Sequence, residues 1–173
     1  MIRKATNADL DGIMVVIEDG RKALKSLGLS QWNGPLGYPN RGNFIKDIED
    51  GGCFIALDNN EVVGTETLGF AFYEYSIAGD TVKWLIDTKN YVAIHRFCVR
   101  SDYKGLGFSH QLLEQALNFA KENGCLSVRI DTHPGNIAMQ KLLLKEGFTN
   151  CGYVIYDYIP VEPKRLVFEK LVK

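Results

Sequence analysis

Tyr91-Val-Ala-Ile-His-Arg-Phe-Cys-Val99, followed by Asp102-Tyr-Lys-Gly-Leu-Gly107, is the stretch of sequence that decides the fold of this chain. Its first segment is rich in β-branched and aromatic side chains and has the length of a buried strand. Leu126-Ser-Val-Arg-Ile-Asp131 is predicted to be the next strand. Between them, apolar residues recur at the spacing of one helix face, at Leu112, Leu113, Ala116, Leu117 and Ala120. A strand joined through a helix to another strand predicts a parallel pair with a right-handed crossover.

The turn between the first strand and the helix, Lys104 to His110, has the composition of a phosphate-binding loop. Small residues that open a helix leave several unpaired backbone N–H groups aimed at one point, with the positive end of the helix dipole behind them. At Gly105 and Gly107 a Cβ would hold an anion away from the backbone. Taken alone, these two glycines are equally compatible with an ordinary tight turn.

Three blocks follow one another in a fixed order: Ile94–Val99, then Lys104-Gly-Leu-Gly-Phe-Ser109, then Asn136, Leu142 and Gly147-Phe148. Together they resemble the central strand, the acyl-CoA pyrophosphate loop and the second conserved block of the GCN5-related N-acetyltransferase (GNAT) family. The loop of that family is usually written Arg or Gln, two residues, Gly, one residue, Gly or Ala. The resemblance covers roughly residues 91 to 156 well and the first 90 only loosely.

Two residues of the loop depart from the family pattern. Lys104 stands where Arg or Gln is usual, which keeps the positive charge but loses the planar hydrogen-bonding fork. Ser109 stands where Gly or Ala is usual, and it is still small. The loop therefore keeps the positive charge, at Lys104, and the small side chain, at Ser109, that a phosphate-binding loop requires.

The resemblance implies a single domain over residues 1–173, of the α/β class, with helices on both faces of the sheet. The sheet is expected to be mixed and mostly antiparallel, with about seven strands and a central parallel pair splayed for acyl-CoA. In the family the pantetheine arm pairs with the backbone of the central strand, where an N–H supports the oxyanion. The implied cofactor-binding residues are Phe97, Cys98, Val99, Lys104, Gly105, Leu106, Gly107, Phe108, Ser109, His110 and Asn136.

The implied reaction transfers an acetyl group from acetyl-CoA to a primary amine by direct attack in a ternary complex. An amine with a pKa of about 10.4 is neutral only about once in a few thousand molecules at pH 7, so its deprotonation costs roughly 4–5 kcal/mol without assistance. His95 lies four residues before Val99, where several family members place a catalytic Glu, and is the first candidate base. The alternative for His95 is a hydrogen-bonded strand histidine in the interior. His133, which leaves the C-terminal end of the next strand, is the second candidate.

The general acid of the family is often a Tyr immediately after the Leu of the second block, and here that position is Leu143. A thiolate with a pKa near 8.5 can depart without much help, so activity does not require this tyrosine. Water, Tyr153 and Tyr156 remain open as proton sources.

The remaining segments are predicted from periodicity and turn residues. Thr6-Asn-Ala-Asp9 has capping-box spacing, with Asp in place of Glu, ahead of an amphipathic helix. Arg21 to Leu27 is predicted to continue as a second helical piece, and Trp84 is expected to anchor the irregular stretch before Tyr91. Further strands are predicted at Ile2–Ala5, Cys53–Leu57, Val62–Phe72, Cys151–Tyr156 and Arg165–Val172, with a short helix at Phe44–Ile48.

Gly28 to Gly42 is the longest stretch without periodicity and is predicted to be a loop. Its aromatic residues, Trp32 and Tyr38, either pack the loop down or contact a ligand. In the family this region lies over the acceptor side of the site, which favours contact with the acceptor. The acceptor itself stays open: a small polyamine, an amino acid, an antibiotic amine or a protein N-terminus is compatible.

Composition places the chain among ordinary proteins with one core. The net charge of −1 argues against nucleic acid as a partner. The N-terminus has no apolar signal region and no apolar run is long enough to span a bilayer, so we expect a cytoplasmic protein without a membrane partner. Four dispersed cysteines predict buried thiols, and the histidines show no metal-ligand spacing, so no metal is expected. A homodimer is compatible with this interpretation.

Two other functions are alternatives to acyl transfer. A dinucleotide-binding oxidoreductase would use strand, glycine turn, helix and Asp131, but His110 stands at the third glycine position and Asp131 lies too far along the chain. A non-catalytic acyl-CoA sensor of the same fold would explain Leu143. Turnover of acetyl-CoA with a panel of amines separates this sensor from an enzyme.

Overall fold

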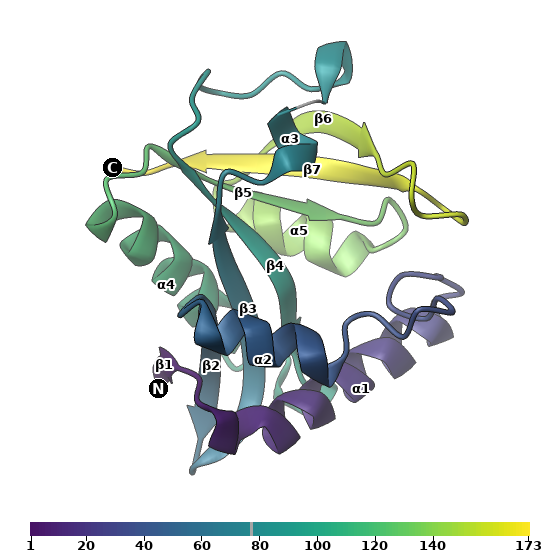
Figure 1. The fold of residues 1–173 in the computed structure, drawn as a ribbon, viewed down its shortest axis with the longest axis vertical. Helices are drawn as coiled ribbons and strands as arrows, with labels where there is room; N and C mark the ends of the chain where they lie inside the picture. The colour runs from purple at the N-terminus through teal and green to yellow at the C-terminus, as the bar shows by residue number, and fades with distance from the viewer. Residues whose placement is uncertain (77) are drawn as a thin grey trace. The chain divides into compact units, whose positions relative to one another are not determined.

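The computed structural model describes residues 1–76 and 78–173, and over these residues the chain forms one seven-stranded sheet (Figure 1). The strands are β1 (Ile2–Lys4), β2 (Cys53–Asp58), β3 (Glu61–Phe70), β4 (Tyr91–Val99), β5 (Ser127–Thr132), β6 (Thr149–Ile155) and β7 (Lys164–Leu171). Their order in the sheet is β1-β2-β3-β4-β5-β7-β6. The pair β4/β5 is parallel, whereas β1/β2, β2/β3, β5/β7 and β6/β7 are antiparallel. The predicted fold class, a mixed and mostly antiparallel sheet with one parallel pair, is confirmed.

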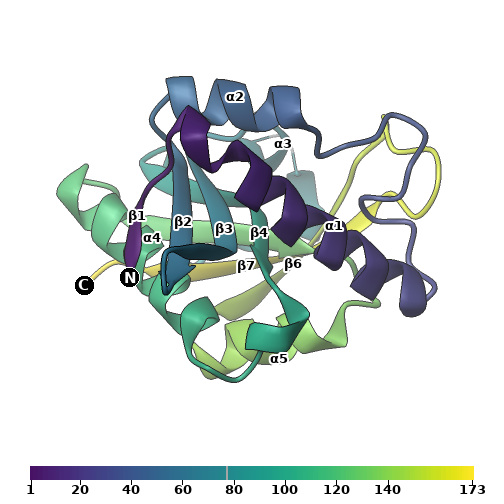
Figure 2. The ribbon, with the colours of Figure 1, turned by 90° about the horizontal axis from the view of Figure 1, so that it is seen from below.

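The helices of the described residues are α1 (Leu10–Ser26), α2 (Arg41–Glu49), α3 (Tyr73–Ser76), α4 (Phe108–Glu122) and α5 (Ile137–Lys145), with 3-10 turns at Asn7–Asp9, Gly79–Thr81 and Ser101–Tyr103. The prediction of a second helical piece from Arg21 was wrong, because α1 runs unbroken to Ser26 (Figure 2). Its buried stripe continues through Gly20 to Leu24, so packing holds the helix together across the glycine. The predicted strand 62–72 ends at Phe70, since Ala71 adopts a left-handed φ of 49°.

The predicted capping box is confirmed at the start of the chain. The Asp9 carboxylate accepts hydrogen bonds from the Thr6 N–H at 2.8 Å and from the Thr6 hydroxyl at 2.9 Å. The Arg3 guanidinium pairs with the same carboxylate at 2.8 Å, and this hydrogen bond is the main reason why the pKa of Asp9 falls to about 2. These contacts fix the point at which β1 gives way to α1.

The contacts of the chain gather in two compact units, and the first comprises Met1–Leu68 and Arg96–Gln115. Its strands carry helices on both faces. On one face α1 and α2 bury a cluster that includes Ile13, Ile17, Phe44 and Ile55. On the other face the start of α4 packs Phe108 and Leu112 against Ala56 and Val63.

The second unit comprises Gly69–His95 and Ala116–Lys173. Its core contains the apolar and aromatic cluster of Tyr75, Tyr91, Ala93, Cys151, Val154, Tyr156 and Val167. Arg129 on β5 lies 4.0 Å from the ring centre of Trp84 and 4.1 Å from that of Tyr91, and it pairs with the buried Glu169 at 2.8 Å. Trp84 therefore anchors the segment before β4, as predicted.

Each of the four cysteines is a buried free thiol, as predicted. Among the described helices, none has the length and apolar character that crossing a membrane requires.

Glu66 on β3 is a carboxyl group with an exposed fraction of 0%. Within the described part of the chain, neither of its carboxyl oxygens has a hydrogen-bond partner. Burial raises the pKa of Glu66 well above its ordinary value. The folded protein therefore holds this group as the neutral acid over a pH range in which the unfolded chain ionises it.

We expect Glu66→Met to stabilise the fold at pH 7 by about 1–3 kcal/mol, because it removes an unpaired buried polar group. In the wild type, the contribution of Glu66 is most favourable below the unfolded pKa of about 4.3 and declines as the pH rises towards the raised folded pKa. The substitution should therefore also flatten the decline in stability between pH 4 and pH 8. Urea unfolding across that range, with Glu49→Met on the exposed side of α2 as control, measures both effects. A lower unfolding midpoint for Glu66→Met at pH 7 would contradict this account.

Candidate active site

The glycine turn predicted to bind phosphate leads directly into α4, a helix of 15 residues. Gly105 and Gly107 have φ values of 80° and 87°, in the left-handed region that favours glycine. A Cβ placed on either would have no atom of the described residues within 4 Å. The turn is therefore open on the side to which these two glycines would direct a side chain.

This turn fits a pyrophosphate group. The first N–H groups of a helix have no acceptor within the helix, and the helix dipole favours negative charge at this end. Lys104, Leu106 and His110 are exposed, whereas the Phe108 ring is buried and lies 5.8 Å from the Tyr103 ring. The predicted loop residues Lys104 to His110 thus lie together, and Phe108 can contribute its backbone rather than its ring.

The residues predicted to line the pantetheine arm, Phe97 to Val99, form the last part of β4. Phe97 and Val99 pack their side chains against the cluster under α4. Cys98 is buried, donates to the Val16 carbonyl at 3.5 Å, and has its pKa raised by burial to about 12. It stays a thiol and cannot serve as a nucleophile, so the backbone is what this segment can offer to an acyl donor.

Asn136 acts as the N-cap of α5, because its side-chain oxygen accepts the Met139 N–H at 3.2 Å. The helix ends as predicted before Gly147-Phe148, where the Phe148 N–H donates to the Leu143 carbonyl at 2.9 Å. Asn136 therefore has a structural role in addition to the predicted contact with the cofactor.

The two candidate bases lie in different surroundings. His95 on β4 is half-buried, and its ring meets the Phe72 ring edge-on with centroids 4.4 Å apart. His133 is buried, its Nδ1 accepts the Gly135 N–H at 2.9 Å, and its Nε2 lies 3.2 Å from Glu162. Burial is the largest influence on His133 and lowers its pKa. The Nδ1 lone pair of His133 is already used, so it must break a hydrogen bond before that atom can accept a proton.

The residues that could protonate the leaving thiolate also differ in their surroundings. Leu143, at the position of the usual tyrosine, has an exposed fraction of 0% and lies in the core. Tyr156 is buried and donates its hydroxyl proton to Asp131 at 2.7 Å, and burial followed by the Asp131 charge raises its pKa. Tyr153 is half-buried, with the Lys164 ammonium 4.2 Å from its ring centre. Tyr156 is thus poorly placed to release a proton to a thiolate.

The loop after α1 holds the two aromatic residues assigned to the acceptor. Trp32 packs against the cluster under α1, and its ring would lie 3.1 Å from a Cβ added to Gly20. Tyr38 is 42% exposed. Arg21 on α1 donates to the carbonyls of Trp32, at 3.2 Å, of Gly37, at 2.9 Å, and of Pro39. Trp32 therefore supports the loop, and Tyr38 is the ring that the loop presents to solvent.

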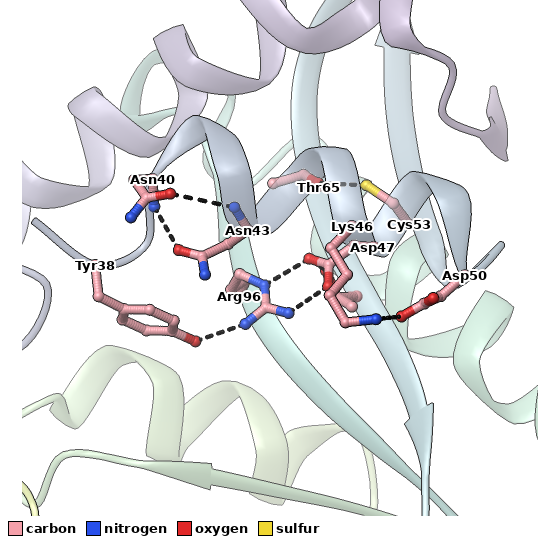
Figure 3. Close-up of polar contacts among 10 residues, drawn as sticks. Tyr38, Asn40, Asn43, Lys46, Asp47, Asp50, Cys53, Thr65 and Arg96 are labelled. Atoms are coloured by element: carbon pink, nitrogen blue, oxygen red, sulfur yellow. Dashed lines mark hydrogen bonds and ion pairs between the residues drawn. The ribbon is translucent and has the colours of Figure 1, made fainter.

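Arg96 on β4 ties this loop to the sheet (Figure 3). Its guanidinium makes a two-pronged ion pair with Asp47 of α2, at 2.7 and 2.5 Å, and donates to the Tyr38 hydroxyl at 2.8 Å. Asp47 also accepts the Thr67 hydroxyl at 2.9 Å. Arg96 has a φ of 50°, a left-handed conformation that costs a non-glycine residue about 1–2 kcal/mol. The charge-assisted bonds to Asp47 offset that cost and hold the bend in the strand.

The sequence interpretation missed Arg21, Arg96 and Asp47. One signal was available for Arg96, because it is the charged residue inside a strand that is otherwise mostly apolar. A charge in such a strand predicts a partner, although nothing in the sequence identifies Asp47 as that partner.

Comparison with known proteins identifies the family to which this chain belongs. Residues 22–148 match the family model described as "Acetyltransferase (GNAT) family", and the chain belongs to that family. It is similar to a curated Escherichia coli protein named streptothricin acetyltransferase, with 26% identity over 123 residues. That match covers 69% of this chain and 62% of the relative, so it leaves more than a third of the relative outside the comparison.

Solved structures agree with this assignment. A GNAT-family acetyltransferase from Streptococcus agalactiae 2603 matches with a TM-score of 0.82 and 29% identity, over 100% of this chain and 95% of that one. A ribosomal-protein-alanine N-acetyltransferase from Brucella melitensis matches with a TM-score of 0.71 over 99% of both chains. Its identity is 19%, so this second likeness shows the fold alone.

We expect Asp47→Ala to destabilise the fold by roughly 3–5 kcal/mol, because it leaves the Arg96 guanidinium half-buried without its counter-charge. The neighbouring ion pair of Lys46 and Asp50 is a matched control. Its N–O distance is 2.8 Å, close to the 2.5 Å of the Arg96–Asp47 pair, but its side chains are 73% and 60% exposed. Asp50→Ala should therefore cost less than about 1 kcal/mol. Chemical denaturation measures both, and equal losses would mean that burial does not distinguish the two pairs.

Proposed function

We propose that this chain is an acyl-CoA-dependent N-acyltransferase, which transfers acetyl from acetyl-CoA to a primary amine by direct attack in a ternary complex. The observation that carries the proposal is the open turn at Gly105 and Gly107 at the start of α4, in a chain that belongs to the GNAT family. Acetyl-CoA supplies the activated thioester. The chain's part is to hold the pyrophosphate at Lys104 to His110 and to present the β4 backbone at Phe97 to Val99.

We assign the removal of the amine proton to His95, with His133 as second candidate. His95 is half-buried on β4, the strand that is to carry the thioester. An imidazole at this place can accept the proton directly or through one water. For the departing thiolate we propose water as the proton source, because Leu143 is in the core and Tyr156 donates to Asp131.

The acceptor is proposed to be a small-molecule or peptide amine that meets Tyr38 and the loop held by Trp32. One relative is named for streptothricin and one fold neighbour for the alanine of a ribosomal protein, so both a small amine and a peptide amine are represented. The buried free thiols support a reducing compartment such as the cytoplasm. The net charge of −1 does not favour nucleic acid as the acceptor.

Gly107→Val tests acyl-CoA binding. A Cβ in the open turn should weaken acetyl-CoA binding by at least about 1–3 kcal/mol, because the backbone donors can no longer reach the phosphate. Gly124→Val is the matched control, since Gly124 lies after the other end of α4, also has a left-handed φ, of 68°, and is also open to solvent. Calorimetry should show tight acetyl-CoA binding in wild type and Gly124→Val only. Equal affinity of the two variants for acetyl-CoA would show that the turn does not bind it.

His95→Ala tests the assignment of the base. A general base contributes 10²–10⁴-fold, so the limiting rate should fall by roughly that factor while the affinity for acetyl-CoA stays within a few-fold. The acidic limb of the pH–rate profile should also be absent in His95→Ala. An unchanged rate and limb in folded His95→Ala, together with a loss of rate in His133→Ala, would transfer the role to His133.

The burial of Leu143 favours a second candidate function, a non-catalytic acyl-CoA sensor. A sensor would bind acetyl-CoA and release no thiol with any amine. Release of free thiol from acetyl-CoA in the presence of a panel of primary amines therefore separates the two functions.

A further inference from the structure

Asp131, the residue before the last one of β5, is held by two tyrosines. Its Oδ2 accepts the hydroxyl of Tyr75 at 2.7 Å and the hydroxyl of Tyr156 at 2.7 Å. Tyr75 comes from α3 and Tyr156 follows β6, so three distant segments of one unit meet at this carboxylate. Both phenols are buried, with exposed fractions of 2% and 6%, whereas Asp131 is half-buried.

Neither phenol supplies a positive charge to this carboxylate. Burial is the largest influence on both tyrosines and raises their pKa values, followed by the negative charge of Asp131. Both phenols therefore stay neutral and add no charge to the cluster. Within residues 1–76 and 78–173 no Lys, Arg or His forms an ion pair with Asp131, and no residue donates to its Oδ1.

A half-buried carboxylate without a counter-charge is unusual, because charged groups in protein interiors are normally paired. A second carboxylate, Glu74, lies near enough to raise the pKa values of Tyr91 and Tyr156 as a lesser cause after burial. Arg129, two residues before Asp131 on β5, is paired with Glu169, so within the described residues no cation pairs with Asp131. This combination is suited to a cationic ligand.

The walls of this cluster are aromatic. Phe72 lies edge-on to Tyr75, with centroids 4.9 Å apart, and to Tyr156, at 6.5 Å. Tyr156 stacks on Tyr158, which is 65% exposed, at 5.6 Å. Faces of aromatic rings attract ammonium groups, and more strongly where water is excluded. Aromatic faces around a carboxylate are the usual chemistry of an ammonium-binding site.

The cluster is also connected to the candidate base. The Phe72 ring that borders the two phenols meets the His95 ring at 4.4 Å, and all of these residues belong to the same unit. Asp131 is thus linked to His95 through a phenol and the Phe72 ring. A molecule with two amino groups joined by an aliphatic chain matches two such separate places.

We propose that Asp131 binds a second ammonium group of the acceptor, distinct from the amine that is acetylated, so that the acceptor class is a diamine or polyamine. This inference rests on the proposed function and adds the substrate class to it. Oδ1 of Asp131 receives the ammonium, while Tyr75 and Tyr156 hold Oδ2 and fix the direction of the carboxylate. Phe72 and Tyr156 supply the aromatic faces.

The test compares 1,4-diaminobutane with butylamine as probes, by thiol release from acetyl-CoA. Wild type should prefer the diamine by at least tenfold in kcat/KM, and Asp131→Asn should lose roughly that factor, because a charge pair of this kind is removed. Asp87→Asn removes an exposed carboxylate in the same unit and should keep the preference. KM for acetyl-CoA should be the same in all three proteins. Absence of a preference in wild type, or its retention in Asp131→Asn, would overturn the proposal.

Two further measurements keep the outcome decisive. Asp131→Glu retains the charge and should keep most of the preference, and a loss as large as that in Asp131→Asn would contradict a role for the charge. Calorimetry with the two amines, without turnover, separates this inference from the proposed function. Diamine binding that depends on Asp131 in a protein without activity would support the ammonium site and contradict the enzyme. Turnover of both amines at equal efficiency would support the enzyme and contradict the site.

Discussion

The ion pair between Arg96 and Asp47 is the constraint on which the first unit of this protein depends. β4 is paired in parallel with β5 from Tyr91 to Ile94, and Arg96 takes its left-handed conformation two residues later. Asp47 holds the Arg96 guanidinium at two points, and the same guanidinium reaches Tyr38 in the loop after α1 (Figure 3). One arginine therefore sets both the course of β4 and the place of the proposed acceptor loop.

Consequences of this bend extend to both ends of β4. Before the bend, His95 lies against Phe72, which borders the phenols that hold Asp131. After the bend, Phe97 to Val99 lead to the glycine turn and to α4. Along β4, the proposed base thus precedes the bend, and the backbone proposed to meet the acyl donor follows it.

Local patterns were sufficient to predict most of the fold. The apolar run of β4, the glycine turn and the periodicity of α4 predicted the parallel pair, and the capping box at Thr6 predicted the start of the first helix. The break that was expected before Arg21 failed because packing of Gly20 against Cys98 and Trp32 is a tertiary contact. No local pattern reports such a contact, since periodicity describes one segment at a time.

The candidate site was predictable only where it is local. The turn at Gly105 and Gly107 could be proposed as a phosphate site because the chemistry of such a site is contained in a few consecutive residues. The pairs that complete the site are separated by 49 residues for Arg96 and Asp47 and by 56 for Tyr75 and Asp131. Their side chains are ordinary types that many surface positions share, so sequence alone cannot pair them.

We propose above all that the backbone at the start of α4 binds the phosphates of acetyl-CoA. Titration of ¹⁵N-labelled protein with acetyl-CoA, followed through its backbone amide resonances, tests this most directly. We expect the largest shifts at Gly105, Gly107, Phe108 and Ser109, and no comparable change with NAD. Largest shifts in another part of the chain, or equal shifts with NAD, would contradict the account.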